Sequence, residues 1–125
     1  MEDTINSQEL WDRLGDDRAL LSELLDDFRQ DYPAQIQAVG EALACEDSPG
    51  VQHAAHSLKG TLGNLAATVG YRLAAKLEDI GRSGQLAQAN SVLTELEQEL
   101  SRVTTALDIL CHGADTRVGH LRSSS

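Results

Sequence analysis

The sequence contains few aromatic residues and only two prolines. Phe, Trp and Tyr together make up 3% of the 125 residues, so a folded core has to consist of Leu, Ala, Val and Ile. An aliphatic core of this kind favours helices, because strands are usually enriched in aromatic and β-branched side chains. A chain of this length fits one domain. The composition therefore predicts a single all-α domain.

Positive charge is also scarce. Ten lysines and arginines stand against twenty acidic residues, which gives a formal net charge of −10. This field would repel the phosphate backbone of a nucleic acid, and the aromatic side chains that stack on single-stranded bases are missing. We therefore expect no nucleic acid among the partners.

Long apolar runs and clustered cysteines are absent as well. No segment approaches the roughly 18 consecutive apolar residues of a membrane-spanning helix, and no signal peptide follows Met1. Cys45 and Cys111 lie far apart, without the spacing of a metal site. We interpret them as reduced thiols and expect a cytoplasmic domain that makes no membrane contact of its own.

Apolar residues recur at helical spacing through most of the chain. A capping-box pattern at residues 6–9 begins a short helix, and Asp16 is the expected N-cap of the next helix. Pro33 should break or kink that second helix, because proline cannot donate the hydrogen bond of an interior position. Ser48 is the expected N-cap of the following helix, with Pro49 in its first turn.

The clearest pattern lies near the end of the chain. Apolar residues between Leu86 and Leu110 recur in steps of three and four, as in a heptad seam. Because the preceding helices carry matching stripes, we interpret this seam as the core of one bundle. The prediction is an up-and-down antiparallel four-helix bundle with one or two short flanking helices. The domain is expected to cover residues 1–112, and residues 113–125 to be a disordered tail or an addition to the domain.

The helix expected at residues 49–66 has an unusual polar face. At about 100° per residue, its apolar residues form one stripe and His56 lies on the opposite side. The residues within about 80° of His56 are Gln52, His53, Lys59, Gly60, Gly63, Asn64 and Ala67, and we call them the polar face. Glycine inside an exposed helix costs about 1 kcal/mol relative to alanine, so two glycines on one face indicate a function.

The chemistry of the polar face suits a phosphoryl group. A neutral imidazole is a competent nucleophile near pH 7, and glycines beside it let the backbone of another protein approach. Lys59, three residues after His56, can neutralise part of the charge of a phosphoryl group on the ring. From the residues alone, an ordinary surface histidine remains an open alternative.

Residues 56–60, His-Ser-Leu-Lys-Gly, resemble the His-x-x-Lys-Gly signature of histidine-containing phosphotransfer (HPt) domains, the relay modules of multistep two-component signalling. The likeness covers about residues 5–110 and includes Ala55, Asn64, Leu65, Ala74, Leu77 and Glu78. Two positions depart from the pattern of the family: Ala66, where glycine is frequent, and Gly70, where leucine is usual.

The resemblance implies a role for each matching residue. His56 would be phosphorylated, Lys59 would be an electrostatic helper, and Gly60 would leave a gap for the partner's active site. The partner would be the receiver domain of a response regulator, which supplies an aspartate and a divalent metal ion. The other residues of the polar face are expected to contact this partner: Gln52, His53, Gly63, Asn64 and Ala67.

The same resemblance implies a carrier and not an enzyme, without an intrinsic cofactor. No Gly-rich phosphate loop or Walker signature occurs, so the chain is not expected to use ATP itself. We expect a monomer that reversibly passes phosphoryl groups between receivers. It would be either a free-standing protein or the end of a hybrid sensor histidine kinase, which can itself be bound to the membrane.

Three alternatives remain open. His53 is a rival acceptor, although Ser57 stands where the matching glycine would be. His53 and His56 are spaced to chelate one metal ion, but two further ligands would be needed and Lys59 would repel the ion. The third alternative is a helical scaffold that binds receivers without exchanging phosphate.

Overall fold

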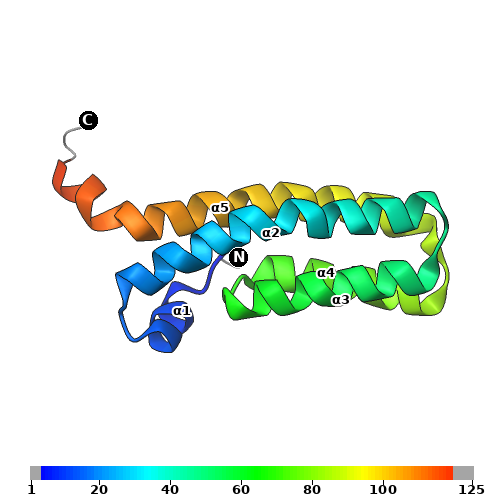
Figure 1. Ribbon diagram of the computed structural model, residues 1–125, viewed down its shortest axis with the longest axis horizontal. Helices are drawn as coiled ribbons and strands as arrows, with labels where there is room; N and C mark the ends of the chain where they lie inside the picture. The colour runs from blue at the N-terminus through cyan, green and yellow to red at the C-terminus, as the bar shows by residue number, and fades with distance from the viewer. Residues whose placement is uncertain (1–3, 120–125) are drawn as a thin grey trace.

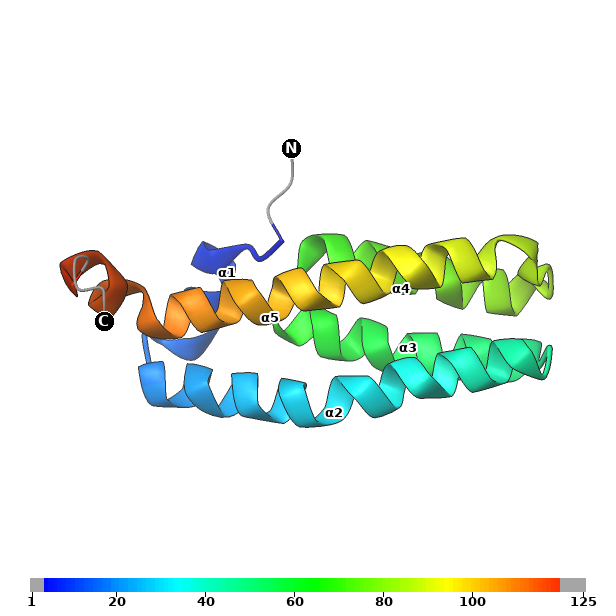
Figure 2. The same ribbon diagram turned by 90° about the horizontal axis from the view of Figure 1, so that it is seen from above.

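The computed structural model describes residues 4–119, with side chains for residues 4–112. Within these residues the elements are α1 (Ser7–Leu14), α2 (Arg18–Ala44), α3 (Ser48–Asn64), α4 (Thr68–Ser83), the 3-10 helix η1 (Leu86–Gln88) and α5 (Ala89–Gly119). The four long helices lie side by side with alternating direction, and α1 lies at one end of the bundle (Figures 1 and 2). The predicted all-α antiparallel four-helix bundle with a short flanking helix is confirmed.

The core of the bundle is aliphatic, as its composition requires. Its largest fully buried side chains come from all five α-helices: Leu10, Leu21, Val39, Val51, Leu58, Leu62, Leu77, Leu96, Leu100, Val103 and Leu107. The middle of the predicted heptad seam, from Leu93 to Leu107, faces this core. The seam is therefore the core stripe of α5, as interpreted from the sequence.

The second helix is longer than predicted. α2 continues through Pro33 to Ala44, so the helix break expected at Pro33 was wrong. Pro33 is exposed, whereas Phe28 before it and Val39 after it are buried in one continuous stripe. Packing on both sides of the proline therefore outweighs the lost hydrogen bond and the steric penalty, which together cost about 3 kcal/mol in a helix interior.

Two helix starts lie one residue away from their predicted positions. Asp17 and not Asp16 caps α2, and Asp47 and not Ser48 caps α3. Each of the two capping carboxylates accepts a hydrogen bond from a backbone N–H three residues on, at 3.1 and 3.0 Å. Asp16 instead adopts a left-handed turn conformation with φ 63°, whereas an N-cap residue typically has an extended backbone.

The last helix extends beyond the predicted domain boundary. α5 continues to Gly119 and projects past the end of the bundle (Figure 1), so the expected tail is helical from residue 113 to 119. Gly113 weakens a helix without ending it, because the backbone can still make its hydrogen bonds. The rest of the expected tail, residues 120–125, lies outside the described residues. Neither α5 nor any other helix between residues 4 and 119 has the length and apolar character of a membrane span.

Helices α3 and α4 form a tightly packed hairpin. Residues 65–67 connect them, and Ala66 in this connection has φ 55°, in the left-handed region. The two backbones come so close near Gly81 that a Cβ atom there would lie 2.5 Å from the backbone nitrogen of Gln52. This close approach brings the side chains of α4 within reach of the polar face on α3.

Candidate functional site

His56 projects outward from the middle of α3. Its side chain is 67% exposed, whereas Ala55 and Leu58 on the same helix are fully buried. The buried neighbours fix the rotation of α3 about its axis, so the imidazole has to face away from the core. The predicted outward orientation of His56 is confirmed.

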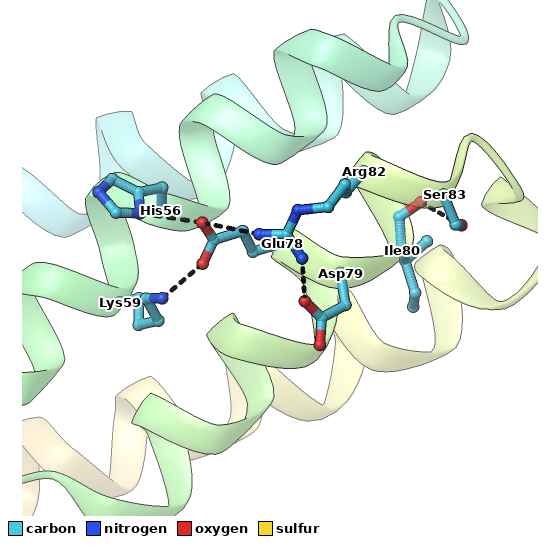
Figure 3. Close-up of polar contacts among 7 residues, drawn as sticks. All are labelled: His56, Lys59, Glu78, Asp79, Ile80, Arg82 and Ser83. Atoms are coloured by element: carbon cyan, nitrogen blue, oxygen red, sulfur yellow. Dashed lines mark hydrogen bonds and ion pairs between the residues drawn. The ribbon is translucent and has the colours of Figure 1, made fainter.

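A buried carboxylate of α4 holds the imidazole. Glu78 has a side chain that is 9% exposed, and its Oε2 atom lies 3.0 Å from Nδ1 of His56. Its other oxygen, Oε1, accepts a hydrogen bond from the Lys59 ammonium at 2.7 Å. Arg82, one turn further along α4, places Nη2 3.5 Å from Oε2 (Figure 3). One carboxylate is thus surrounded by an imidazole, an ammonium and a guanidinium group.

The Glu78 contact determines which ring nitrogen of His56 is free. An ionised carboxylate only accepts hydrogen bonds, so we assign the imidazole proton to Nδ1. The neutral ring then keeps its lone pair on Nε2, which points away from Glu78 in Figure 3. The site therefore presents an oriented nitrogen nucleophile to the surface.

Glu78 and Lys59 each stabilise the charged form of the other. The hydrogen bond from Lys59 lowers the pKa of Glu78 below its ordinary value, with a smaller contribution from His56, and these effects exceed the opposing effect of burial. The same hydrogen bond raises the pKa of Lys59. Near neutral pH the carboxylate and the ammonium are therefore both ionised.

The two glycines of the polar face have different surroundings. A Cβ atom added at Gly60 would meet no atom within 4 Å, so the packing of this chain does not require glycine there. A Cβ atom at Gly63 would lie 3.3 Å from the ring of Tyr71, so this glycine has an internal packing reason. The open space at Gly60, one turn after His56, leaves room for an approaching molecule.

A comparison with known protein families matches residues 23–106 of the chain to the Hpt domain. The chain belongs to the Hpt domain family. As an Hpt domain it is a phosphotransfer intermediate of a phosphorelay, a carrier and not a kinase, and its partners are receiver domains of two-component systems. The predicted family and its function class are confirmed.

The fold of this Hpt domain is similar to that of a solved structure. The crystal structure of histidine-containing phosphotransfer protein B (HptB) from Pseudomonas aeruginosa PAO1 superimposes with a TM-score of 0.82 at 23% sequence identity. The similarity covers 90% of this chain and 97% of that chain. No match was found among the curated proteins.

The remaining residues predicted for docking are divided between surface and core. Gln52 and His53 line a shallow groove with Pro49, His56 and Glu78, and Asn64 is exposed at the end of α3. Ala67 is 1% exposed, so its predicted place on the polar face was wrong. The helical phase ends at Asn64, and the left-handed Ala66 turns the chain before Ala67, which caps α4.

Two residues of this Hpt site were not assigned a role from the sequence. Glu78 matches the family pattern, but no role follows from that match, and the sequence predicts no role for Arg82. A signal for Glu78 was available, because it shares the buried stripe of α4 with Ala74, Leu77 and Gly81. An acidic residue on an otherwise apolar helix face needs a partner.

The metal-binding alternative is not favoured by the arrangement of side chains. No group of three or more His, Cys, Asp and Glu side chains in the described part of the chain could hold a metal ion. His53 and His56 therefore lack the further ligands that a chelated ion would need.

Proposed function

We propose that His56 is the phosphorylated residue of this Hpt domain, taking a phosphoryl group from a receiver aspartate and passing it to another receiver. The observation that supports this assignment is the contact between Nδ1 of His56 and the buried Glu78 carboxylate, at 3.0 Å. It leaves Nε2 unprotonated and outward, as an attacking nitrogen has to be.

The transfer step needs no proton movement within this chain. The lone pair of Nε2 attacks the phosphorus atom of the aspartyl phosphate, an N–P bond forms, and the P–O bond breaks to release the aspartate carboxylate. The ring keeps its proton on Nδ1 and becomes positively charged. Glu78 stabilises this developing charge through the same hydrogen bond, and the reverse reaction passes through the same states.

Lys59 and Gly60 have supporting roles in this proposal. The Lys59 ammonium lies on the same side of α3 as the imidazole and offsets part of the phosphoryl charge. The open space at Gly60 admits the loops of the receiver. The receiver would contribute the aspartate and a divalent metal ion, and this chain would contribute no cofactor of its own.

The setting of the domain is also part of the proposal. We expect a cytoplasmic domain. We also expect a monomer, because the large apolar side chains exposed among the described residues, Leu20, Tyr71 and Ile109, come from three different helices. A hybrid sensor histidine kinase is a suitable donor, through its receiver domain. Gln52, His53, Gly63 and Asn64 would contact the receiver around the transferred group.

A labelling experiment tests the assignment. Receiver domains from the same organism, each carrying radioactive phosphate on its aspartate, are mixed with the purified chain. We expect label on the wild type and on His53→Gln, and none on His56→Gln, which removes the nucleophile and keeps similar bulk. Label on His56→Gln at the wild-type level would refute the assignment. Receiver binding without label on the wild type would instead support the scaffold alternative.

A further inference from the structure

Glu78 has a second cation close by that it does not fully use. The distance of 3.5 Å from Arg82 Nη2 to Oε2 is too long for a good hydrogen bond, whereas Lys59 lies at 2.7 Å from Oε1. Arg82 donates instead to Asp79, a side chain that is 72% exposed. The guanidinium is therefore adjacent to the buried carboxylate but is held mainly by a surface partner.

Phosphorylation of His56 creates a conflict for Lys59. A phosphoryl group carries about two negative charges near neutral pH, and Lys59 is the cation that α3 offers next to it. Its ammonium is already bound to Glu78, whose carboxylate is 9% exposed. If Lys59 turns to the phosphoryl oxygens, Oε1 of this carboxylate loses its cation, while Oε2 keeps the hydrogen bond from Nδ1 of His56. A buried charge that loses part of its hydrogen bonding destabilises the protein.

We propose that Arg82 is the reserve counter-ion of Glu78. When His56 carries the phosphoryl group, Lys59 leaves Oε1 for the phosphoryl oxygens, and the guanidinium of Arg82 moves onto the Glu78 carboxylate. Arg82 is then a positioning residue, since it touches neither the phosphoryl group nor the imidazole. This inference rests on the proposed phosphorylation of His56.

The geometry makes the exchange easy. Nη2 of Arg82 needs to move by less than about 1 Å to bring its 3.5 Å distance from Oε2 to the 2.7–2.9 Å of a charge-assisted hydrogen bond, which adds a cation to the same carboxylate without taking the position of Lys59. Its side chain is 56% exposed and lies one helical turn from Glu78, so the core is not disturbed. Releasing Asp79 costs little, because ion pairs between exposed side chains contribute little to stability.

A double-mutant cycle tests the exchange. The wild type, Arg82→Gln, Lys59→Gln and the double variant are each equilibrated with one phosphorylated receiver, and the fraction of label on the domain is measured. We expect Arg82→Gln to lower the transfer equilibrium constant about tenfold when Lys59 is present. In the Lys59→Gln background the same change should have an effect of less than about twofold, because Arg82 then pairs with Glu78 before and after phosphorylation.

Two further measurements separate this role from general effects. Lys76→Gln removes one positive charge from an exposed position of α4 and should leave the equilibrium constant unchanged. The NMR signal of the Arg82 side-chain N–H should shift and exchange more slowly with water after phosphorylation of the wild type.

The outcomes distinguish this inference from the proposed function. If the wild type is labelled and Arg82→Gln has the same effect in both Lys59 backgrounds, or no effect, the exchange is refuted while His56 remains the acceptor. If the wild type is not labelled by any receiver, both proposals are refuted together.

Discussion

The imidazole of His56 and the carboxylate of Glu78 are joined by a 3.0 Å hydrogen bond across two helices, between residues that are 22 positions apart in the sequence. The histidine is exposed and the glutamate is buried. An exposed imidazole is thus oriented by an anion that is fixed in the helix packing, and several measurable consequences depend on this contact.

Removing the carboxylate should slow phosphoryl transfer. A charge-assisted hydrogen bond contributes about 1.5–3 kcal/mol, so we expect Glu78→Ala to reduce the single-turnover rate from a phosphorylated receiver roughly 10- to 100-fold. Glu78→Gln keeps an acceptor oxygen but loses the charge, and its rate should lie between those of the alanine variant and the wild type. Glu97→Gln, which neutralises an exposed acid of α5, is the control. A wild-type rate for Glu78→Ala would contradict the role of this carboxylate.

Substitution of Gly60 should separate stability from transfer. Because an added Cβ meets no atom within 4 Å, Gly60→Ala should raise the free energy of unfolding by about 0.5–1 kcal/mol in chemical denaturation. In the proposed complex the same methyl group would lie where the receiver approaches, so transfer should slow roughly tenfold. Gly40→Ala on α2, where a Cβ also meets nothing, should give the stability gain with unchanged transfer. Equal transfer rates for both variants would show that the gap at Gly60 is not used.

Lowering the pH should reduce the free energy of unfolding, in part because Glu78 becomes protonated. Its pKa is lowered in the folded protein, chiefly by the Lys59 hydrogen bond, from an ordinary value of 4.5. Its contribution to the free energy of unfolding is therefore present above that value and is lost as the pH falls through the lower folded pKa. Denaturation series from neutral pH downward should show a steeper loss of stability for the wild type than for Glu78→Gln. Parallel curves would exclude this contribution.

The connection between α3 and α4 contains a strained residue. Ala66 has φ 55°, and a residue with a Cβ atom loses about 1–2 kcal/mol in the left-handed region. Ala66→Gly should therefore raise the free energy of unfolding by about 1 kcal/mol, despite the loss of one buried methyl group. Ala67→Gly, at φ −86°, should lower it instead. A loss of stability in both variants would show that the methyl group at position 66 matters more than the strain.

The helices were predictable where the controlling interactions are local. The heptad seam of α5 and the outward face of His56 follow from the spacing of apolar residues within one helix. Pro33 misled the prediction because its penalty is local, whereas the burial of Phe28 and Val39 that keeps α2 continuous depends on the other helices. The left-handed φ of Ala66 gives a physical reason for the glycine that is frequent at this position in the family. This conformation could not be predicted from the sequence alone.

The side chains that α3 contributes to the site were predictable from the sequence, but their contacts with α4 were not. A helical wheel of α3 groups His56 with Lys59 and Gly60, but it contains no information on the register between α3 and α4. That register, set by the close approach at Gly81, decides that Glu78 lies beneath the histidine. Ala67 was misplaced for a different reason. The helical wheel was continued to residue 67, although α3 ends at Asn64.

The hairpin of α3 and α4 also has a consequence for the order of events in folding. His56, Lys59, Glu78 and Arg82 all lie within residues 56–82, and the connection between their helices spans only residues 65–67. Closing such a short connection has a small entropic cost, and contacts between neighbours in sequence form quickly. These four side chains can thus come together early on the nascent chain, before α5 arrives to complete the bundle.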